Sequence, residues 1–221
     1  MAQILFTART GGFSQGVYSS LNLGEHVGDC PSDVELNRKI LSELVSRRSA
    51  KFMNQVHGSD VVEVDSNSTS PVTADALITR ETGLPLVVLT ADCLPILISS
   101  RSVVGVIHAG RKGVLNGIIG KTVNQMRQAG AQYLVATIGP AICKNCYEVS
   151  TEMYEEVVSA MPELATSVAS HSLDLLAAAK VQLKALEVQA TSVDICTAHN
   201  ENFFSYRRDG KTGRNAGAIV L

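Results

Sequence analysis

The hydrophobic positions in the middle of the chain form continuous runs rather than an alternating pattern. The run 84–89 is rich in leucine and valine, begins after Gly83 and ends at a polar turn over residues 90–92. A second run, 103–107, is rich in valine and ends at His108-Ala109-Gly110. Apolar runs of this length, bounded by small or polar residues, are typical of strands that are buried on both faces. We therefore expect buried strands whose ends carry Cys93 and His108.

Helical periodicity is found in stretches that alternate with these strand-like runs. Ser32 is a candidate N-cap for the first of them, and Gly130 follows the second. The expected helices are Pro31 to Ser46, Val114 to Gln128, Thr151 to Met161 and Leu173 to Leu186.

The order of elements mixes two kinds of connection. The runs 84–89 and 95–99 resemble hairpin neighbours, whereas 103–138 reads as a strand-helix-strand unit, and the apolar end 216–221 as a final strand. This mixture predicts an α+β fold with mixed β-sheets flanked by helices. No internal repeat or linker is visible, and the polar stretch 66–71 reads as a surface loop, so residues 1–221 are expected to form a single domain.

Composition narrows the class of protein. With 221 residues, 45% of them hydrophobic, and a net charge of -2, the chain can bury a large core. It has neither a run of apolar residues long enough for a membrane span nor an export signal, so we expect no membrane association and a cytoplasmic location. It also lacks a basic stripe with interleaved aromatics, which argues against nucleic acid as a partner. Five cysteines, an odd number, fit reduced thiols.

Three residues of metal-ligand type stand where apolar runs meet small-residue turns. They are His57 in Asn-Gln-Val-His-Gly, Cys93 in Thr-Ala-Asp-Cys-Leu-Pro and His108 in His-Ala-Gly. Two imidazoles and a thiolate suit a zinc ion with one open position, which is the catalytic arrangement. A single cysteine after a strand is also commonly a buried small hydrophobe, and a histidine there is commonly only hydrogen-bonded. The spacing alone leaves both interpretations open.

Further motifs accompany these three along nearly the whole chain. They are Phe6-Thr7-Ala8-Arg9-Thr10-Gly11-Gly12, Leu21-Asn22-Leu23-Gly24, Ala74-Asp75-Ala76-Leu77-Ile78-Thr79, Ile138-Gly139-Pro140, Cys146-Tyr147-Glu148-Val149 and Phe203-Phe204-Ser205-Tyr206-Arg207-Arg208-Asp209-Gly210. In this order they resemble the YfiH family, also called the laccase-domain or multicopper polyphenol oxidase family. The resemblance implies that His57, Cys93 and His108 hold the metal, with Zn²⁺ as the expected ion and Cu²⁺ possible.

The sequence differs from the usual family motif directly after Gly110. Members usually have His-Ala-Gly-Trp-Arg-Gly, whereas this chain has Arg111 and Lys112 after Gly110 and contains no tryptophan. We expect a pocket that lacks one aromatic wall, with a changed substrate preference.

Basic and polar residues near the motifs are candidates for binding substrate or phosphate. Arg111 and Lys112 lie between a strand and a helix, where free backbone N–H groups favour an anion. The stretch lacks the glycine spacing of a P-loop, so a solvated basic turn explains it equally well. Arg207 lies in the cationic C-terminal stretch, and its guanidinium could pair with phosphate or, equally, with Asp209. Arg38, like Arg9, is a weaker candidate of the same kind, and Asn54 opens the motif around His57.

Candidate catalytic residues are the carboxylates nearest the metal motifs. Asp92 precedes Cys93, and Asp75 lies in the Ala-Asp-Ala stretch, so either could orient a ligand or accept a proton. Cys93 itself is the third catalytic candidate.

A second set of metal-ligand residues is split between two short pairs. Cys143 and Cys146 form one pair and Cys196 and His199 the other. They could close a structural zinc site, although ordinary buried thiols explain them as well.

The resemblance implies purine nucleoside chemistry: phosphorolysis of adenosine, inosine and methylthioadenosine, with adenosine deamination alongside. Two other enzyme classes stay open, a copper-dependent polyphenol oxidase and a cysteine hydrolase that edits a peptidoglycan precursor with Cys93 as nucleophile and His108 as base. A domain that only binds a nucleotide or a protein is a fourth reading. Five histidines are few for a multicopper relay, which needs several copper sites.

Overall fold

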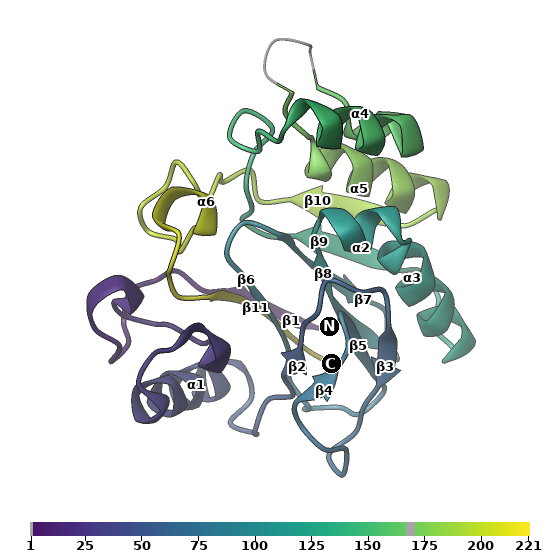
Figure 1. Ribbon diagram of the computed structural model, residues 1–221. Coiled ribbons are helices and arrows are strands. Elements are labelled where there is room, and N and C mark those ends of the chain that lie inside the picture. Colours follow the sequence, from purple (N-terminus) through teal and green to yellow (C-terminus); the bar gives the residue numbers. More distant parts are fainter. Residues whose placement is uncertain (1, 167–170) are drawn as a thin grey trace.

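The computed structural model describes residues 2–166 and 171–221, and their elements are arranged in four layers (Figure 1). The larger sheet has the order β10-β9-β7-β8-β5-β3, and the smaller has the order β1-β11-β6. The strands of the larger sheet are β3 (Val61–Glu63), β5 (Ala76–Thr79), β7 (Leu94–Ser99), β8 (Val104–Ala109), β9 (Val135–Ile138) and β10 (Gln189–Ser192). Those of the smaller are β1 (Gln3–Phe6), β6 (Leu86–Thr90) and β11 (Asn215–Val220), while β2 (Met53–Asn54) and β4 (Val72–Thr73) pair separately.

Both strand directions occur in the larger sheet. Strand β7 is antiparallel to both of its neighbours, β8 and β9, whereas β10 is parallel to β9 and β3 is parallel to β5. The smaller sheet is antiparallel throughout. The predicted α+β class with mixed sheets is therefore confirmed.

The central strands are covered on both faces, as their continuous apolar sequences predict. In β5, Ile78 packs in a core shared with the helices, whereas Leu77 packs in the core between the two sheets. In β6, Val88 faces the larger sheet and Val87 faces the outer helix α1 (Pro31–Val45). The smaller sheet is thus sandwiched between α1 and the larger sheet, whose other face is covered by helices.

The covering helices depart from the sequence prediction at two points. The expected helix 114–128 is two helices, α2 (Arg111–Leu115) and α3 (Ile118–Gln128), because Gly117 between them adopts φ 77°. The N-cap position of helix α1 is Cys30 rather than Ser32, since Pro31 occupies the first helical position, and the Cys30 side chain makes no capping hydrogen bond. The remaining helices are α4 (Thr151–Ala160), α5 (Leu175–Ala185), α6 (Tyr206–Asp209) and the 3-10 turns η1 (Gly16–Tyr18), η2 (Glu25–Val27) and η3 (Pro162–Leu164).

The expected hairpin between runs 84–89 and 95–99 is wrong. Strands β6 and β7 belong to different sheets, and residues 91–93 carry the chain from one sheet to the other. Two consecutive strands that are buried on both faces have the same apolar sequence whether they pair or separate, so the pattern could not distinguish the two cases. As a consequence, Cys93 lies where the two sheets meet.

The final apolar run forms β11, as predicted, and lies between β1 and β6. Its pairing of Val220 with Gln3 brings the two ends of the chain side by side (Figure 1). None of the helices described here combines the length and apolar character that crossing a bilayer requires.

Candidate metal centre and its pocket

His57, Cys93 and His108 come together at the meeting point of the two sheets. His57 lies in the loop between β2 and β3, Cys93 in the turn before β7, and His108 near the end of β8. Their ligand atoms all lie within 4.8 Å of one another, and Cys93 Sγ is 3.9 Å from His57 Nε2. Pairing of Pro95 with His108 across β7 and β8 explains how the thiol and the imidazole meet.

Asp75 lies beneath this cluster and connects two of its members. Its fully buried carboxylate accepts hydrogen bonds from the backbone N–H groups of His57 (3.0 Å) and Gly58 (2.7 Å). Its Oδ1 also accepts a hydrogen bond from Nδ1 of His108 at 2.8 Å. This contact places the Nδ1 proton of His108 toward the carboxylate and leaves Nε2 free to face Cys93 and His57.

Charges within the cluster stabilise one another. Burial alone would raise the pKa of the Cys93 thiol, but the charge and hydrogen bond of His108 outweigh it and lower that pKa to about 6. Burial would lower the pKa of His108, yet the Cys93 thiolate and Asp75 raise it to about 9. The pKa of Asp75 is lowered despite burial, chiefly by its hydrogen bond to His108. In the absence of a metal, the arrangement therefore favours a thiolate beside an imidazolium.

The backbone around the cluster is tightly constrained. His57 has φ 59° and Asp92 has φ 103°, both in the left-handed region that residues other than glycine rarely adopt. A Cβ atom at Gly110 would lie 3.0 Å from Cys93 Sγ and 3.1 Å from the His57 ring. A larger residue at position 110 would therefore displace the side chain of Cys93 or of His57.

Asp92 holds the turn before Cys93 to the C-terminal part of the chain. Its Oδ1 accepts hydrogen bonds from the hydroxyls of Thr197 and Ser205, each at 2.7 Å. Its Oδ2 accepts the backbone N–H of Arg207 at 2.7 Å, and its backbone carbonyl accepts the N–H of Ile142. This carboxylate is thus engaged in fixing the Cys93 turn.

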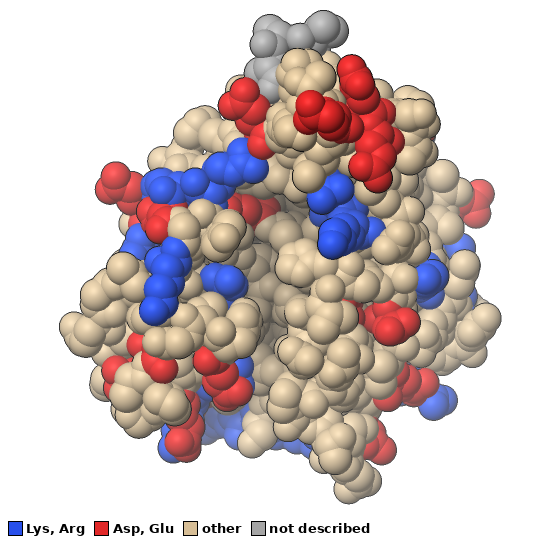
Figure 2. All heavy atoms as spheres, viewed as in Figure 1, with Lys and Arg blue, Asp and Glu red and all other residues tan. Residues whose placement is uncertain are grey.

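A cavity of about 400 Å³ opens directly above the cluster. Figure 2 shows a hollow in the centre of this face, with lysine and arginine side chains on both sides of its upper part. Apolar, aromatic and cationic side chains line the cavity together with the three cluster residues. These lining residues are His26, Gln55, Leu89, Thr90, Ala91, Asp92, Ile142, Tyr147, Leu175, Tyr206, Arg207 and Arg214.

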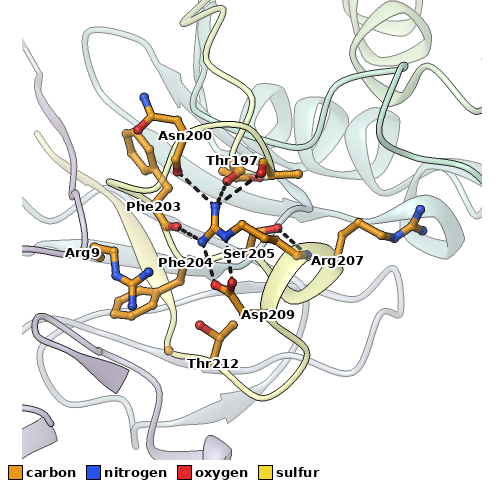
Figure 3. Close-up of polar contacts among 12 residues, drawn as sticks. Arg9, Thr197, Asn200, Phe203, Phe204, Ser205, Arg207, Asp209 and Thr212 are labelled. Carbon is orange, nitrogen blue, oxygen red and sulfur yellow. Dashed lines mark hydrogen bonds and ion pairs between the residues drawn. The ribbon is translucent and has the colours of Figure 1, made fainter. Parts of the chain in front are cut away.

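Of the basic and polar candidates, Arg207 is the one that lines this cavity. Its guanidinium donates to the backbone carbonyls of Cys146 and Glu148, each at 2.8 Å, and lies 5.4 Å from the centre of the Tyr147 ring. The neighbouring Arg208 has a different position: it donates to the carbonyls of Thr197, Asn200 and Phe203 and pairs with Asp209. In Figure 3, Arg207 extends away from that group. Of the two, Arg207 is therefore the one with its side chain at the cavity.

The other basic and polar candidates lie outside the cavity. Arg111 begins α2 and is close enough to Tyr147 to lower its pKa, although burial of the phenol has the larger, opposite effect. Lys112 is exposed. Arg38 stacks 3.9 Å from the centre of the Phe52 ring and pairs with Glu25, and Asn54 is exposed and bonded to Thr73.

Several cavity residues were not singled out from the sequence. Arg214, which precedes β11, has a partly buried guanidinium that donates to the carbonyls of Thr212 and Gly213, and none of the described carboxylates forms an ion pair with it. Gln55 forms two hydrogen bonds with the backbone of Leu89, which ties the His57 loop to β6. The sequence could have indicated Arg214 through its place in the cationic C-terminal stretch. It could have indicated Gln55 through its position two residues before His57.

Fold and cluster together define an α+β protein with a Cys–His centre at the bottom of a pocket. The chain belongs to the family described as multi-copper polyphenol oxidoreductase laccase, because the model of that family matches residues 3–221.

Relatives from several bacteria agree with this assignment. The chain is 41% identical, over 98% of its length and 94% of the relative, to a protein of Streptomyces coelicolor named purine nucleoside phosphorylase. It is 36% identical, over 97% of its length and 92% of the relative, to purine nucleoside phosphorylase YfiH of Shigella flexneri. A crystal structure of a Neisseria meningitidis protein, of the family DUF152, superposes with a TM-score of 0.91 at 36% identity over the whole chain and 94% of that protein. The resemblance to the YfiH family is thereby confirmed.

Proposed function

We propose that this protein is a zinc-dependent purine nucleoside phosphorylase that acts on adenosine, inosine and methylthioadenosine and also deaminates adenosine. The observation that carries the proposal is the position of an open three-donor cluster at the bottom of a cavity that is also lined by two arginines. The names of the relatives support the reaction class.

The chemistry of His57, Cys93 and His108 fits zinc with one position left for substrate or water. Ligand atoms of a tetrahedral zinc ion lie about 3.3–3.8 Å from one another. Cys93 Sγ and His57 Nε2, at 3.9 Å, are close to that spacing. When bound, zinc would polarise a substrate heteroatom or lower the pKa of a water molecule.

Arg207 and Arg214 are the proposed phosphate-binding residues. Both line the cavity, and guanidinium groups bind phosphate through paired, charge-assisted hydrogen bonds. Burial, together with the charges of Arg214 and Arg38, lowers the pKa of His26, which also lines the cavity. Arg207 and Arg214 therefore supply positive charge to the cavity, which suits an anion.

The remaining walls suit a nucleoside. Tyr147 and Tyr206 offer aromatic faces on which a purine can stack, and Leu89, Ile142 and Leu175 add apolar surface. A cavity of about 400 Å³ is large enough for one such ligand. In phosphorolysis a phosphate oxygen bonds to C1′ of the ribose while the glycosidic bond breaks. The purine leaves with that bond's electron pair and takes up a proton.

Asp75 and Asp92 act as positioning residues in this proposal. Asp75 orients His108 and the His57 loop, and Asp92 fixes the Cys93 turn and the backbone of Arg207. Both carboxylates are buried and already accept several hydrogen bonds. Their interactions hold donors and cations in place rather than moving protons.

Copper-dependent oxidation is less well supported by the arrangement of the histidines. His57 and His108 are in the cluster and His26 is on the cavity wall, whereas His171 stacks beside Tyr154 and His199 is near Cys146. Within residues 2–166 and 171–221, neither group of potential metal ligands contains more than two histidines. A multicopper relay needs more.

The test is nucleoside turnover by purified, zinc-loaded protein with and without phosphate. We expect release of purine and ribose 1-phosphate that needs phosphate, stops with a chelator, returns with zinc and is lost in His57→Ala. Oxygen uptake is followed on the same samples. The proposal is wrong if wild type and His57→Ala both fail to consume any nucleoside. Activity that rises when metal is removed would instead favour a free Cys93 nucleophile.

We also propose that the protein works in the cytoplasm on small molecules. All five cysteines are unpaired, which fits a reducing compartment.

A further inference from the structure

A second group of metal-ligand side chains is separate from the three-donor cluster. Cys143 and Cys146 lie in the loop after β9, and Cys196 and His199 in the loop after β10. Their ligand atoms all lie within 4.8 Å of one another, and Cys146 Sγ is 3.0 Å from His199 Nε2. Two pairs separated by half a hundred residues in sequence thus meet at one point.

Backbone contacts hold the two loops together around this point. Ala141 and Cys196 form a parallel bridge, with the N–H of Thr197 bonded to the Ala141 carbonyl at 3.0 Å. The backbone N–H of Cys143 donates to Cys196 Sγ at 3.3 Å. Such N–H to sulfur hydrogen bonds stabilise a thiolate over a thiol. The contact fixes the sulfur of Cys196 against the backbone of the loop that carries Cys143 and Cys146.

Each pair has the spacing and turn of a zinc loop. Cys143 and Cys146 are three residues apart, and the N–H of Cys146 bonds to the carbonyl of Cys143 at 3.0 Å. Cys196 and His199 have the same separation, and the N–H of Asn200 bonds to the carbonyl of Cys196. Short loops that contribute two ligands each are the usual frame of a structural zinc site.

The donor set has four members, one more than the cluster at the cavity. Three thiols and one imidazole make a closed tetrahedral Cys₃His set with no position left for substrate. The three thiols are half-buried and His199 is exposed, so none of the four is a fully buried core residue, as an ordinary structural cysteine would be. We propose that Cys143, Cys146, Cys196 and His199 bind one zinc ion as a structural site.

The two loops that this zinc would join also form one wall of the cavity. Tyr147 follows Cys146 directly, and the Cys146 carbonyl accepts a hydrogen bond from the cavity residue Arg207 at 2.8 Å. Thr197, between Cys196 and His199, donates to Asp92 at 2.7 Å. The structural zinc thus keeps Tyr147 and the Asp92 turn at a fixed separation. Its loss makes the cavity less rigid, although every residue that lines the cavity is still present.

Zinc content of protein purified under reducing conditions tests the proposal. We expect His199→Ala and Cys146→Ser each to lose about one zinc ion per chain relative to wild type, and His199→Cys to keep it, because Cys₄ sites also hold zinc. Cys30→Ser and His171→Ala remove the same kinds of side chain outside both clusters and should leave the content unchanged. His199 is exposed, so its replacement leaves the core intact.

The absorption spectrum of cobalt-substituted His57→Ala protein reports on the second site alone. We expect intense thiolate-to-cobalt absorption that disappears in His57→Ala/His199→Ala, together with a fall in melting temperature. Wild-type zinc content in both His199→Ala and Cys146→Ser would overturn the proposal, as would a disulfide among these three cysteines in the reduced preparation. His57→Ala removes one proposed ligand of the metal in the cavity. Cobalt binding in this background therefore tests the second site whether or not the protein is a phosphorylase.

Discussion

His108 donates from Nδ1 to the buried carboxylate of Asp75 at 2.8 Å, and the same carboxylate accepts the backbone N–H of His57 at 3.0 Å. One side chain thus sets the ring orientation of one proposed ligand and the loop position of another. Loss of a hydrogen bond that orients a metal ligand typically weakens metal binding about 10- to 100-fold.

Replacing Asp75 with asparagine should therefore weaken zinc binding. In Asp75→Asn an NH₂ group replaces one of the two acceptor oxygens. In the Oδ1 position it would face the donors of His57 and His108, and in the Oδ2 position it would face the N–H of Gly58, so in either case acceptors are lost. We expect about 10- to 100-fold weaker zinc binding, measured by competition with a chromophoric chelator. Asp60→Asn, a matched change at an exposed position in the same loop, should leave the affinity unchanged. Equal affinities for the two variants would contradict the positioning role.

The two charges of the metal-free cluster should make opposing contributions to the pH dependence of stability, which largely cancel between about pH 6.5 and about pH 9. The folded-state pKa of Cys93, about 6, lies below its ordinary value of 9.0, so the thiolate's contribution is complete above the ordinary value and is lost as pH falls through about 6. The folded-state pKa of His108, about 9, lies above 6.5, so its contribution is complete below 6.5 and is lost as pH rises through about 9.

Urea unfolding of chelator-treated protein across this pH range measures the effect. In wild type we expect little change, because the Cys93 contribution rises with pH while the His108 contribution falls. In Cys93→Ser the rising contribution is absent and Asp75 still favours charged His108, so we expect stability to decline as pH rises. Cys30→Ser, at an exposed cysteine, should retain the wild-type profile. Identical profiles for wild type and Cys93→Ser would show that the pair is not charged.

Removal of the Arg214 guanidinium should raise the KM for phosphate. Loss of a charge-assisted hydrogen bond costs about 1.5–3 kcal/mol, which corresponds to a rise of roughly 10- to 100-fold for Arg214→Ala. Arg214→Lys keeps the charge but not the planar fork and should show an intermediate effect. Arg80→Ala disrupts an exposed ion pair with Glu63 and serves as the control. A KM that rises for nucleoside but not for phosphate would assign Arg214 to the other substrate.

Gly110→Ala should impair metal binding without unfolding the protein. The added Cβ would lie 3.0 Å from Cys93 Sγ and 3.1 Å from the His57 ring, so one of these side chains must move. Gly120→Ala is the matched control, because a Cβ there meets no atom within 4 Å and alanine favours the helix by about 0.5–1 kcal/mol. Gly110→Ala should lose zinc, whereas Gly120→Ala should keep its zinc content and gain thermal stability. Full zinc content in Gly110→Ala would contradict the close packing.

Much of the fold could be predicted because buried strands and amphipathic helices leave clear periodic patterns. The positions of Cys93 and His108 at strand ends followed from those patterns. The separation of β6 and β7 into two sheets could not be predicted, since their sequences are apolar on both faces in either arrangement. The break at Gly117 was also missed, because one left-handed residue interrupts a helix without changing its hydrophobic pattern.

The candidate site could be predicted only in part from the sequence, for a related reason. The sequence motifs indicated the three proposed ligands, and the cationic C-terminal stretch indicated Arg207. The hydrogen bonds from Asp92 to Thr197 and Ser205 span 105 and 113 residues, and local patterns carry no information about pairings of that length. Arg214 enters the cavity because β11 places it there, which depends on the same long-range topology.

Those contacts of Asp92 have a consequence for the order in which the protein is made. During synthesis the ribosome releases His57, Cys93 and His108 long before it releases Thr197 and Ser205. Contacts that close such large loops form late in folding. A nascent chain would therefore carry every proposed zinc donor of the cavity while the turn that presents Cys93 is still free to move. We expect chains stalled before Thr197 to bind zinc more weakly than the finished protein, so that tight metal loading marks the completion of translation.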